Sequence, residues 1–214
     1  MTRRTIVFAA GIAVVALFGI GAYLYSSMKA EDHSPGSVTQ NTPLVRPHSP
    51  VIGNPDAPVT IVEFFDPACE SCRAFYPYVK DIMNSYDGKV RLVLRYANFH
   101  PQSGDAIRLL EAARNQGKFV AVLERLLATQ ARWAPHGRDG DSVWSTLPGT
   151  GLDIEQAKRD ALLPAVAEVM AQDAADVVAA GVKGTPTFYV NGKRLKIFGP
   201  EGLADLVRSE VEAN

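Results

Sequence analysis

The pattern of apolar and polar positions along the chain predicts an α/β domain. Val59 to Phe65 is a β-branched, apolar run typical of a buried strand, and Asp66 and Pro67 end it. Apolar residues at helical spacing follow as far as Tyr86, and Val90 to Ala97 is a second run rich in β-formers. A strand, a helix and a strand within about 40 residues make a parallel βαβ unit.

The region from about residue 103 to 181 is predicted to be a helical insertion. Ser103 is placed to cap its first helix, and Asp153 starts a capping-box pattern for a later one. Pro164 suits the first turn of a helix that ends at Gly181. The aliphatic stripes on these helices are most simply core positions.

A hairpin and a last helix follow the insertion. Asn191-Gly192 joins the β-rich run 184–190 to a second run, Lys193 to Phe198, and Asn-Gly is a strong hairpin signal. Pro200 then opens a final helix. The order of elements is strand, helix, strand, helices, hairpin, helix.

The N-terminus is predicted to be a signal anchor within residues 1–25. Ile6 to Tyr25 is an uncharged apolar run of about 20 residues, long enough to span a bilayer as one transmembrane helix. Its length and the lack of a good cleavage site favour an uncleaved anchor over a cleaved signal peptide, which is the alternative. Arg3 and Arg4 precede the helix, which places the N-terminus on the cytoplasmic side.

Residues 26–50 are predicted to be a flexible tether, and residues 51–214 the folded domain. The tether is rich in Ser, Pro, Thr and His, and its His33 and His48 are expected to be solvated. The 214-residue length and 47% hydrophobic content allow one well-packed domain plus an appendage. A net charge of −1 leaves no basic stripe to hold nucleic acid.

The candidate chemistry lies at Cys69 and Cys72, which are the two cysteines of the chain. Cys69 falls at or near the start of the predicted helix, where unpaired backbone amides and the helix dipole stabilise a thiolate. Cys72 lies one turn further on the same face and can reach Cys69. The arrangement is typical of a reactive dithiol.

Two other interpretations of the pair stay open. A structural disulfide between them would close a loop of about four residues and stabilise the fold by only about 2 kcal/mol. A zinc or copper site would need further ligands, and the chain offers no other cysteine and only scattered histidines. Redox chemistry is favoured over both.

On these residues, the chain from Val51 to Glu212 resembles the DsbA-like disulfide oxidoreductases of the thioredoxin-fold superfamily. The resemblance rests on the Cys-x-x-Cys motif after a Phe-Phe strand and on the Gly-Thr-Pro-Thr-Phe sequence, residues 184 to 188, some 115 residues later. It implies a thioredoxin fold with a helical insertion between the βαβ half and the hairpin–helix half. It also implies that Cys69 is the nucleophile and Cys72 the resolving thiol.

The resemblance implies further site residues. Pro186 would be a cis-proline whose loop, with Gly184 and Thr185, faces the dithiol and binds substrate backbone. Glu63 matches the family's buried acid beneath the active site, where it would carry a proton.

One departure concerns the two residues between the cysteines. Strong oxidants of the family resemble Cys-Pro-His-Cys, whereas this chain has Glu70 and Ser71. A carboxylate about 6 Å from the thiolate in an exposed setting disfavours it by about 1 kcal/mol. The change is expected to moderate the oxidising power of the protein.

The implied function is that of a membrane-anchored thiol–disulfide oxidoreductase whose domain faces the periplasm from the bacterial inner membrane. It would oxidise cysteines of protein substrates as a monomer, without metal or organic cofactor. A quinone-linked oxidant or a transmembrane reductant in the membrane would be its redox partner. A reductase or isomerase kept reduced by a membrane electron donor is the alternative, and a copper- or zinc-binding dithiol module is the remote one.

Overall fold

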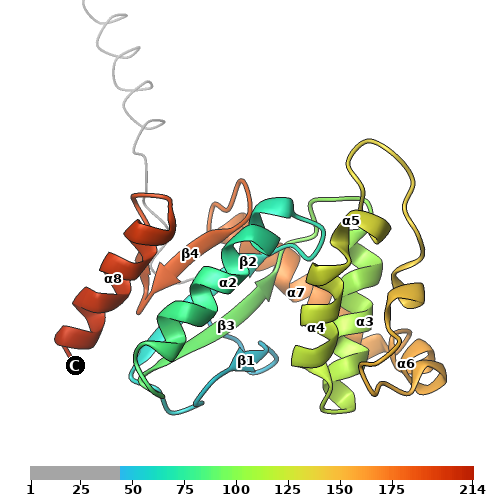
Figure 1. The fold of residues 1–214 in the computed structure, drawn as a ribbon, viewed down its shortest axis with the longest axis horizontal. Coiled ribbons are helices and arrows are strands. Elements are labelled where there is room, and N and C mark those ends of the chain that lie inside the picture. The colour runs from blue at the N-terminus through green and yellow to red at the C-terminus, as the bar shows by residue number, and fades with distance from the viewer. Residues whose placement is uncertain (1–43) are drawn as a thin grey trace, which may run out of the picture. The chain divides into compact units, whose positions relative to one another are not determined.

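A five-stranded mixed sheet forms the centre of the part of the chain that the computed structural model describes, residues 44–214 (Figure 1). Its spatial order is β1-β3-β2-β4-β5, with β2 and β3 parallel and the other neighbours antiparallel. The strands are β1 (Val51–Ile52), β2 (Val59–Phe65), β3 (Val90–Tyr96), β4 (Thr187–Val190) and β5 (Lys193–Arg194).

The two strands predicted for the βαβ unit are confirmed. β2 and β3 pair in register from Val59 opposite Val90 to Phe65 opposite Tyr96. β2 is central and buried almost throughout, because β4 pairs with its other edge and helices cover both faces. This explains why its sequence is nearly continuous in apolar residues.

The described residues contain seven α-helices and one short 3₁₀-helix, η1. Five of the α-helices lie between β3 and β4, which confirms the predicted helical insertion. The helices are α2 (Glu70–Asn84), α3 (Ser103–Asn115), α4 (Phe119–Ala128), α5 (Gln130–Trp133), η1 (Val143–Thr146), α6 (Ile154–Asp160), α7 (Pro164–Ala179) and α8 (Pro200–Glu212).

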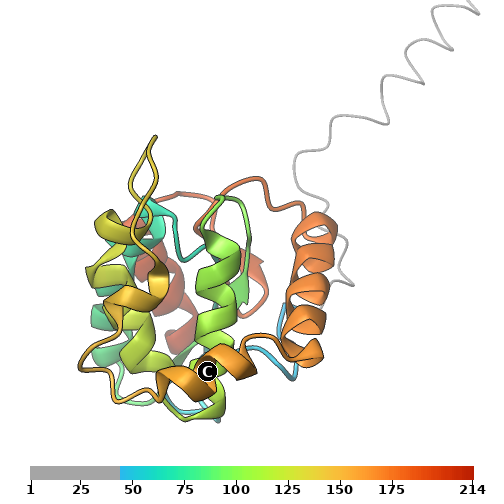
Figure 2. The same cartoon turned by 90° about the vertical axis from the view of Figure 1, so that its right-hand side faces the viewer.

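The helices divide between the two faces and one side of the sheet. α2 and α8 pack together over one face, and α7 lies against β3 on the other (Figures 1 and 2). The helices α3 to α6 gather beside the sheet, where α3 contacts both α4 and α6. The N-terminal end of α2 and the loop after α5 therefore lie at the same end of the domain (Figure 1).

The hairpin turn is confirmed, but the strand predicted after it is too long. Asn191 and Gly192 have φ of +45° and +84°, as a two-residue hairpin with a primed turn requires. β5 contains only Lys193 and Arg194 of the predicted run to Phe198. The chain leaves the sheet edge after these residues, and the ring of Phe198 packs on Phe75 with 4.8 Å between centroids.

The two helix starts predicted from capping residues have different outcomes. The Asp153 carboxylate accepts a hydrogen bond from the amide of Gln156, so Asp153 caps α6 as predicted. Ser103 is not a cap, because it is the first helical residue of α3. Its buried hydroxyl donates instead to the carboxylate of Asp66.

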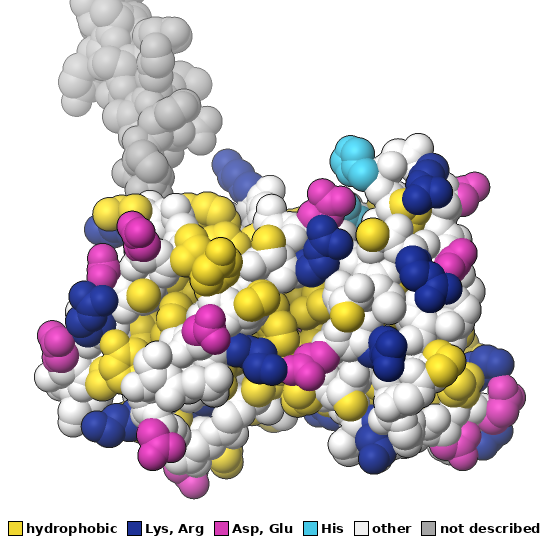
Figure 3. All heavy atoms as spheres, in the orientation of Figure 1, with side chains coloured by type: hydrophobic (Ala, Val, Ile, Leu, Met, Phe, Trp, Pro, Cys, Tyr) yellow, Lys and Arg dark blue, Asp and Glu magenta, His cyan; other side chains and the backbone are white. Residues whose placement is uncertain are grey.

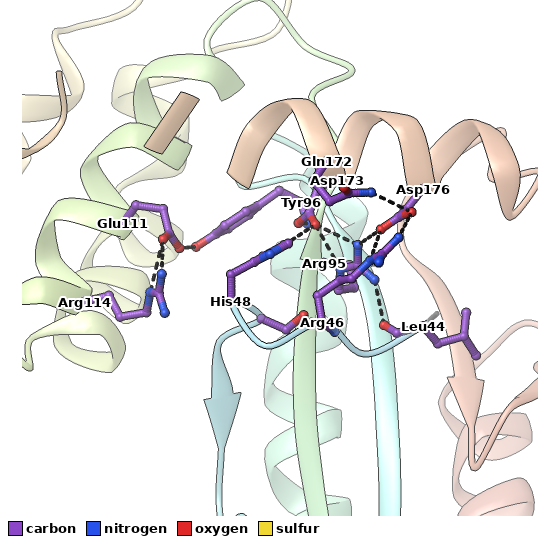
Figure 4. Close-up of polar contacts among 11 residues, drawn as sticks. Leu44, Arg46, His48, Arg95, Tyr96, Glu111, Arg114, Gln172, Asp173 and Asp176 are labelled. Atoms are coloured by element: carbon purple, nitrogen blue, oxygen red, sulfur yellow. Dashed lines mark hydrogen bonds and ion pairs between the residues drawn. The ribbon is translucent and has the colours of Figure 1, made fainter. Parts of the chain in front are cut away.

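The segment 44–50 packs on α7 through two side chains (Figure 4). Nε and Nη2 of Arg46 donate to the carboxylate of Asp176 at 2.8 and 2.7 Å. Nε2 of His48 lies 2.8 Å from Oδ1 of Asp173. These contacts make the segment part of the folded domain.

The folded domain therefore begins before residue 51, within the predicted tether of residues 26–50. The expectation that His48 is solvated is wrong, because a buried carboxylate binds it. His33 and the predicted transmembrane helix of residues 1–25 lie outside the described residues. Among residues 44–214, no helix has both the length and the hydropathy that crossing a membrane requires.

A buried ion-pair network centred on Arg95 joins the sheet to α7 (Figure 4). Arg95 of β3 and Asp173 of α7 are both fully buried, and Nη2 of Arg95 lies 2.7 Å from Oδ1 of Asp173. Arg95 also pairs with Asp176 and donates to the carbonyl oxygen of Leu44. Asp173 accepts a further hydrogen bond from the backbone amide of Tyr96. Removing one partner of such a network leaves the remaining buried charge less fully compensated.

We predict that Asp173→Asn lowers the free energy of unfolding by about 3 kcal/mol, because Arg95 loses a buried charged partner. Asp141→Asn is the matched control, since Asp141 pairs with Arg132 at the surface with both side chains more than half exposed. That change should cost less than about 1 kcal/mol. Urea unfolding of both variants measures the difference, and equal losses would contradict a structural role for the network.

Candidate active site

The two cysteines lie at the start of α2, as the sequence predicts. Cys69 is the N-cap residue with extended backbone angles (φ −75°, ψ 122°), and Cys72 lies in the first turn. Cys69 is 7% exposed and Cys72 fully buried, and both are free thiols. An attacking sulfur can therefore reach Cys69 but not Cys72.

The environment separates the acidities of the two thiols. The pKa of Cys69 is lowered to about 5, first by a hydrogen bond from the Cys72 thiol. Burial opposes this shift, while Thr185 and the backbone amides of Ser71 and Cys72 reinforce it. Burial raises the pKa of Cys72 well above its ordinary value, and the hydrogen bond to Cys69 and the charge of Glu63 raise it further. The site thus stabilises one thiolate, on Cys69.

The loop before β4 faces the dithiol. The Thr185–Pro186 peptide bond is cis. The Cys69 thiol donates to the carbonyl oxygen of Thr185 at 3.3 Å, although the two residues are 116 positions apart. Pro186 is buried, Thr185 is partly exposed and Gly184 is exposed. The predicted loop therefore presents backbone groups beside the reactive sulfur.

Glu63 is buried beneath the dithiol, in the middle of β2. It is 1% exposed, and neither carboxyl oxygen has a hydrogen bond of ordinary geometry to any residue of the 44–214 domain. Burial raises its pKa to about 8, the negative charge of Cys69 adds to the rise, and the Cys72 thiol opposes it. Near neutral pH the carboxyl group therefore carries a proton that it can give to a neighbouring sulfur.

Glu70 and Ser71 are both exposed on the first turn of α2. The main influences on the pKa of Cys69 are Cys72, burial, Thr185 and the Ser71 amide, and Glu70 is not among them. An exposed carboxylate is screened by water and salt. The expected penalty from Glu70 is therefore small beside the hydrogen bonds that stabilise the thiolate.

Asp66 holds the active-site loop, a role that the sequence did not indicate beyond the end of a strand. Its buried carboxylate accepts five hydrogen bonds, two of them from His100. The other donors are the amides of Ala68 and Phe99 and the hydroxyl of Ser103. One side chain thus joins the end of β2, the loop after β3 and the start of α3.

Gln130 of α5 holds the same loop from the helical insertion. Its buried Nε2 donates to the carbonyl oxygens of Pro67 at 2.8 Å and Cys69 at 3.0 Å. A glutamine 61 residues from Cys69 gives no local signal in the sequence. Its position is set by the packing of the insertion on the sheet.

A cleft of about 620 Å³ opens between Cys69 and the helical insertion. We call it the active-site cleft. Its walls include Ser71 from α2, His100 from the loop after β3 and Pro135 from the loop after α5. Across residues 44–214, no cluster of three or more His, Cys, Asp or Glu side chains has a geometry that could hold a metal ion.

Comparison with known proteins identifies the family. A family model described as Thioredoxin matches residues 46–208, which is most of the chain. The chain belongs to the thioredoxin family. A thioredoxin-like oxidoreductase from Silicibacter pomeroyi DSS-3 has 31% sequence identity to it and a TM-score of 0.65, covering 85% of this chain and 99% of its own.

Two other solved structures show the same fold. BdbD from Bacillus subtilis has 25% identity and a TM-score of 0.63, over 77% of this chain and 93% of its own. α-DsbA1 from Wolbachia pipientis shares the fold at 14% identity, with a TM-score of 0.66 over 82% of this chain and 99% of its own. With its dithiol at a helix start, this chain resembles the thioredoxin-like oxidoreductase in sequence as well as in fold.

Among curated proteins, the thioredoxin-family domain matches part of a longer protein. The Na(+)/H(+) antiporter NhaA 1 of Mycobacterium sp. (strain KMS) is 35% identical over 179 residues. The match covers 78% of this chain but only 27% of the antiporter. The chain thus spans about a quarter of the length of this relative.

We predict that Glu63→Gln increases stability at pH 8–9 while slowing disulfide exchange. Because the pKa of Glu63 is raised to about 8, its favourable contribution to stability is complete below its ordinary pKa and is lost as pH rises through about 8. Glutamine removes this loss, so the variant should unfold at higher urea concentration at pH 9. Glu70→Gln, an exposed change on the same element, should leave the pH dependence of stability unchanged.

The exchange rate tests the proton on Glu63 separately. The wild-type rate attributable to proton donation should fall as pH rises through about 8, where the carboxyl group loses its proton. Glu63→Gln should be slower at pH 7 and lack this fall. A variant that is stabilised yet exchanges at the wild-type rate at every pH would show that Glu63 carries no proton in the reaction.

Proposed function

We propose that this protein is a membrane-anchored thiol–disulfide oxidase that introduces disulfides into protein substrates on the periplasmic side of the bacterial inner membrane. The observation that carries the proposal is the position of Cys69 at the N-cap of α2, beside the Thr185 loop and the Cys72 thiol, where its pKa is lowered to about 5. A stabilised thiolate favours the reduced form of the dithiol, so the Cys69–Cys72 disulfide accepts electrons readily.

The oxidase reaction has two exchange steps. A substrate thiolate attacks Sγ of Cys69 in the Cys69–Cys72 disulfide, and the bond to Cys72 breaks. The electron pair of that bond stays on Cys72, which takes a proton from the buried carboxyl group of Glu63. A second substrate thiolate then attacks the substrate sulfur of the mixed disulfide and releases Cys69 as a thiolate. The substrate is oxidised by two electrons and the protein is reduced by two.

The surface around the dithiol supports a protein substrate. Hydrophobic side chains gather on the face formed by α2 and α8 (Figure 3). Tyr78 of α2 is 49% exposed, and Ile197 and Phe198, just before α8, are 77% and 61% exposed. The backbone groups at Gly184 and Thr185 are proposed to pair with substrate backbone beside Cys69. An unfolded chain offers both apolar side chains and free backbone groups to such a surface.

The proposed location rests on the sequence before the domain. The uncharged run from Ile6 to Tyr25 would anchor the chain, and the residues before Leu44 would connect that anchor to the domain. The antiporter relative supports this location, since its name is that of a membrane transport protein. A quinone-linked oxidant in the membrane would reoxidise the dithiol of a monomer held close to it.

Thiol trapping in intact cells tests direction and anchoring together. Growing cells are quenched in acid, free thiols are alkylated with a mass tag, and membrane and soluble fractions are compared. We predict that the protein stays in the membrane fraction after carbonate extraction and that its dithiol is protected from the tag as a disulfide. A dithiol found mostly as tagged thiols would select the reductase alternative. A soluble protein that begins after residue 25 would contradict the anchor.

A further inference from the structure

His100 lies in the active-site cleft but outside the Cys-x-x-Cys motif. It belongs to the loop between β3 and α3, and it lines the cleft together with Cys69. Its side chain is 43% exposed, whereas its partner Asp66 is fully buried. The His100 ring is therefore exposed to solvent in the cleft, and the buried Asp66 carboxylate holds it from the protein side.

The anchor fixes which ring nitrogen of His100 is free. Nδ1 of His100 lies 2.7 Å from Oδ2 of Asp66. Asp66 receives hydrogen bonds from backbone amides and a hydroxyl as well, so it acts as a carboxylate that only accepts. Nδ1 must then carry the hydrogen of this bond. In the neutral ring, Nε2 keeps its lone pair, and no residue within 44–214 forms a hydrogen bond with it.

We propose that His100 is the acid–base catalyst for the substrate thiol, taking its proton as the sulfur attacks Cys69. Asp66 is the positioning residue, because it sets the tautomer of the ring and stabilises the imidazolium that forms. The arrangement matches other nucleophilic sites, in which a carboxylate orients an imidazole and the imidazole takes the proton of the nucleophile. Here Asp66 is the carboxylate, His100 is the imidazole and the substrate sulfur is the nucleophile.

The substrate S–H bond breaks, its proton moves to Nε2 of His100, and its sulfur forms a bond to Sγ of Cys69. The Cys69–Cys72 bond breaks, and its electron pair stays on Cys72. In the reverse direction the imidazolium returns the proton to the departing substrate thiolate, so the same residue serves oxidation and reduction. The inference rests on the roles of Cys69 and Cys72 in exchange and not on the direction of electron flow.

The substrate thiol is the group whose deprotonation needs a base. The Cys69 thiolate is already stabilised by the site, whereas a cysteine with a pKa near 8.5 in an unfolded substrate is only about 3% ionised at pH 7. Complete deprotonation could therefore raise the rate by at most about 30-fold. The sequence between the cysteines offers no suitable base for this purpose, since a serine hydroxyl is not basic and a carboxylate is ordinarily a much weaker base than imidazole.

His100 shares the cleft with other charged and titratable groups. His136 is the other histidine of the cleft, and no residue of the described chain holds its ring by a hydrogen bond. Of these two histidines, His100 is the one whose ring is held by a hydrogen bond at Nδ1 while Nε2 has no partner among the described residues. The charged or titratable residues that line the cleft, besides His100, are Cys69, Glu70, His136, Arg138 and Asp139.

The test compares a thiol with a selenol. The full chain is purified and oxidised, and an excess of a peptide with two cysteines reduces its disulfide at pH 7 under rapid acid quench. The same peptide with selenocysteines is the second probe, because selenols are already ionised at this pH. His100→Asn keeps a donor for Asp66 but removes the base. We expect His100→Asn to slow the reaction with the cysteine peptide by about tenfold, within the 30-fold limit set by thiol ionisation. The selenocysteine peptide should react within about twofold of the wild-type rate.

Two further variants complete the test. His100→Gln should show the same split between probes, so the result does not depend on one substitution. His136→Asn is the matched control and should leave both rates unchanged. Equal slowing of both probes by the His100 variants would show a structural or binding role and overturn the proposal. Unchanged rates with both probes, or the same split in His136→Asn, would also overturn it.

Discussion

The candidate active site depends on the stabilisation of one negative charge, that of Cys69 at the start of α2. A hydrogen bond from the Cys72 thiol makes the largest contribution, and the first amides of the helix add to it. The same charge acts on the site below, because it helps to raise the pKa of Glu63. One sulfur is therefore ionised while the carboxyl group beneath it is kept protonated. This division of protons supports the proposed roles of Cys69 as the attacking thiol and Cys72 as the resolving thiol.

Three segments that are distant in the sequence keep the helix start in place. Asp66 holds the loop from the sheet, Gln130 holds it from the helical insertion, and the Thr185 carbonyl oxygen lies 3.3 Å from Sγ of Cys69. Each uses a polar group to bind backbone or sulfur in a region where unpaired polar atoms are costly. Two groups in the described part of the chain depart from this: Oε1 of Gln130 and both carboxyl oxygens of Glu63 are buried without an ordinary hydrogen bond, and only in Glu63 is the group ionisable. Such an unsatisfied group fits a role in proton transfer better than one in stability.

The sequence was sufficient to predict the features that depend on local pattern. The strands β2 and β3, the hairpin at Asn191 and the insertion follow from periodicity and turn chemistry, and the position of Cys69 follows from the helix start. The resemblance to DsbA-like proteins supplied the loop at Pro186 and the acid at Glu63. The burial of Glu63 was foreseeable because its neighbours on β2 are apolar.

The features that depend on long-range contacts could not be predicted. The hydrogen bonds of Gln130 and the five donors around Asp66 depend on how the insertion packs, and no periodicity encodes them. His48 appeared solvated because its segment lacks large apolar residues, yet the buried carboxylate of Asp173 on α7 binds it. Ser103 appeared to be a cap because its true partner, Asp66, is 37 residues away in the sequence.

The measurement that tests the account most directly is the reduction potential of the Cys69–Cys72 pair. Equilibration of the full chain with glutathione of known redox ratio at pH 7 gives this value. The stabilised Cys69 thiolate predicts a potential clearly above that of thioredoxin, about −270 mV, and towards that of a strong oxidant, about −120 mV. A potential at or below about −270 mV would contradict the claim that the site is built to accept electrons from substrates.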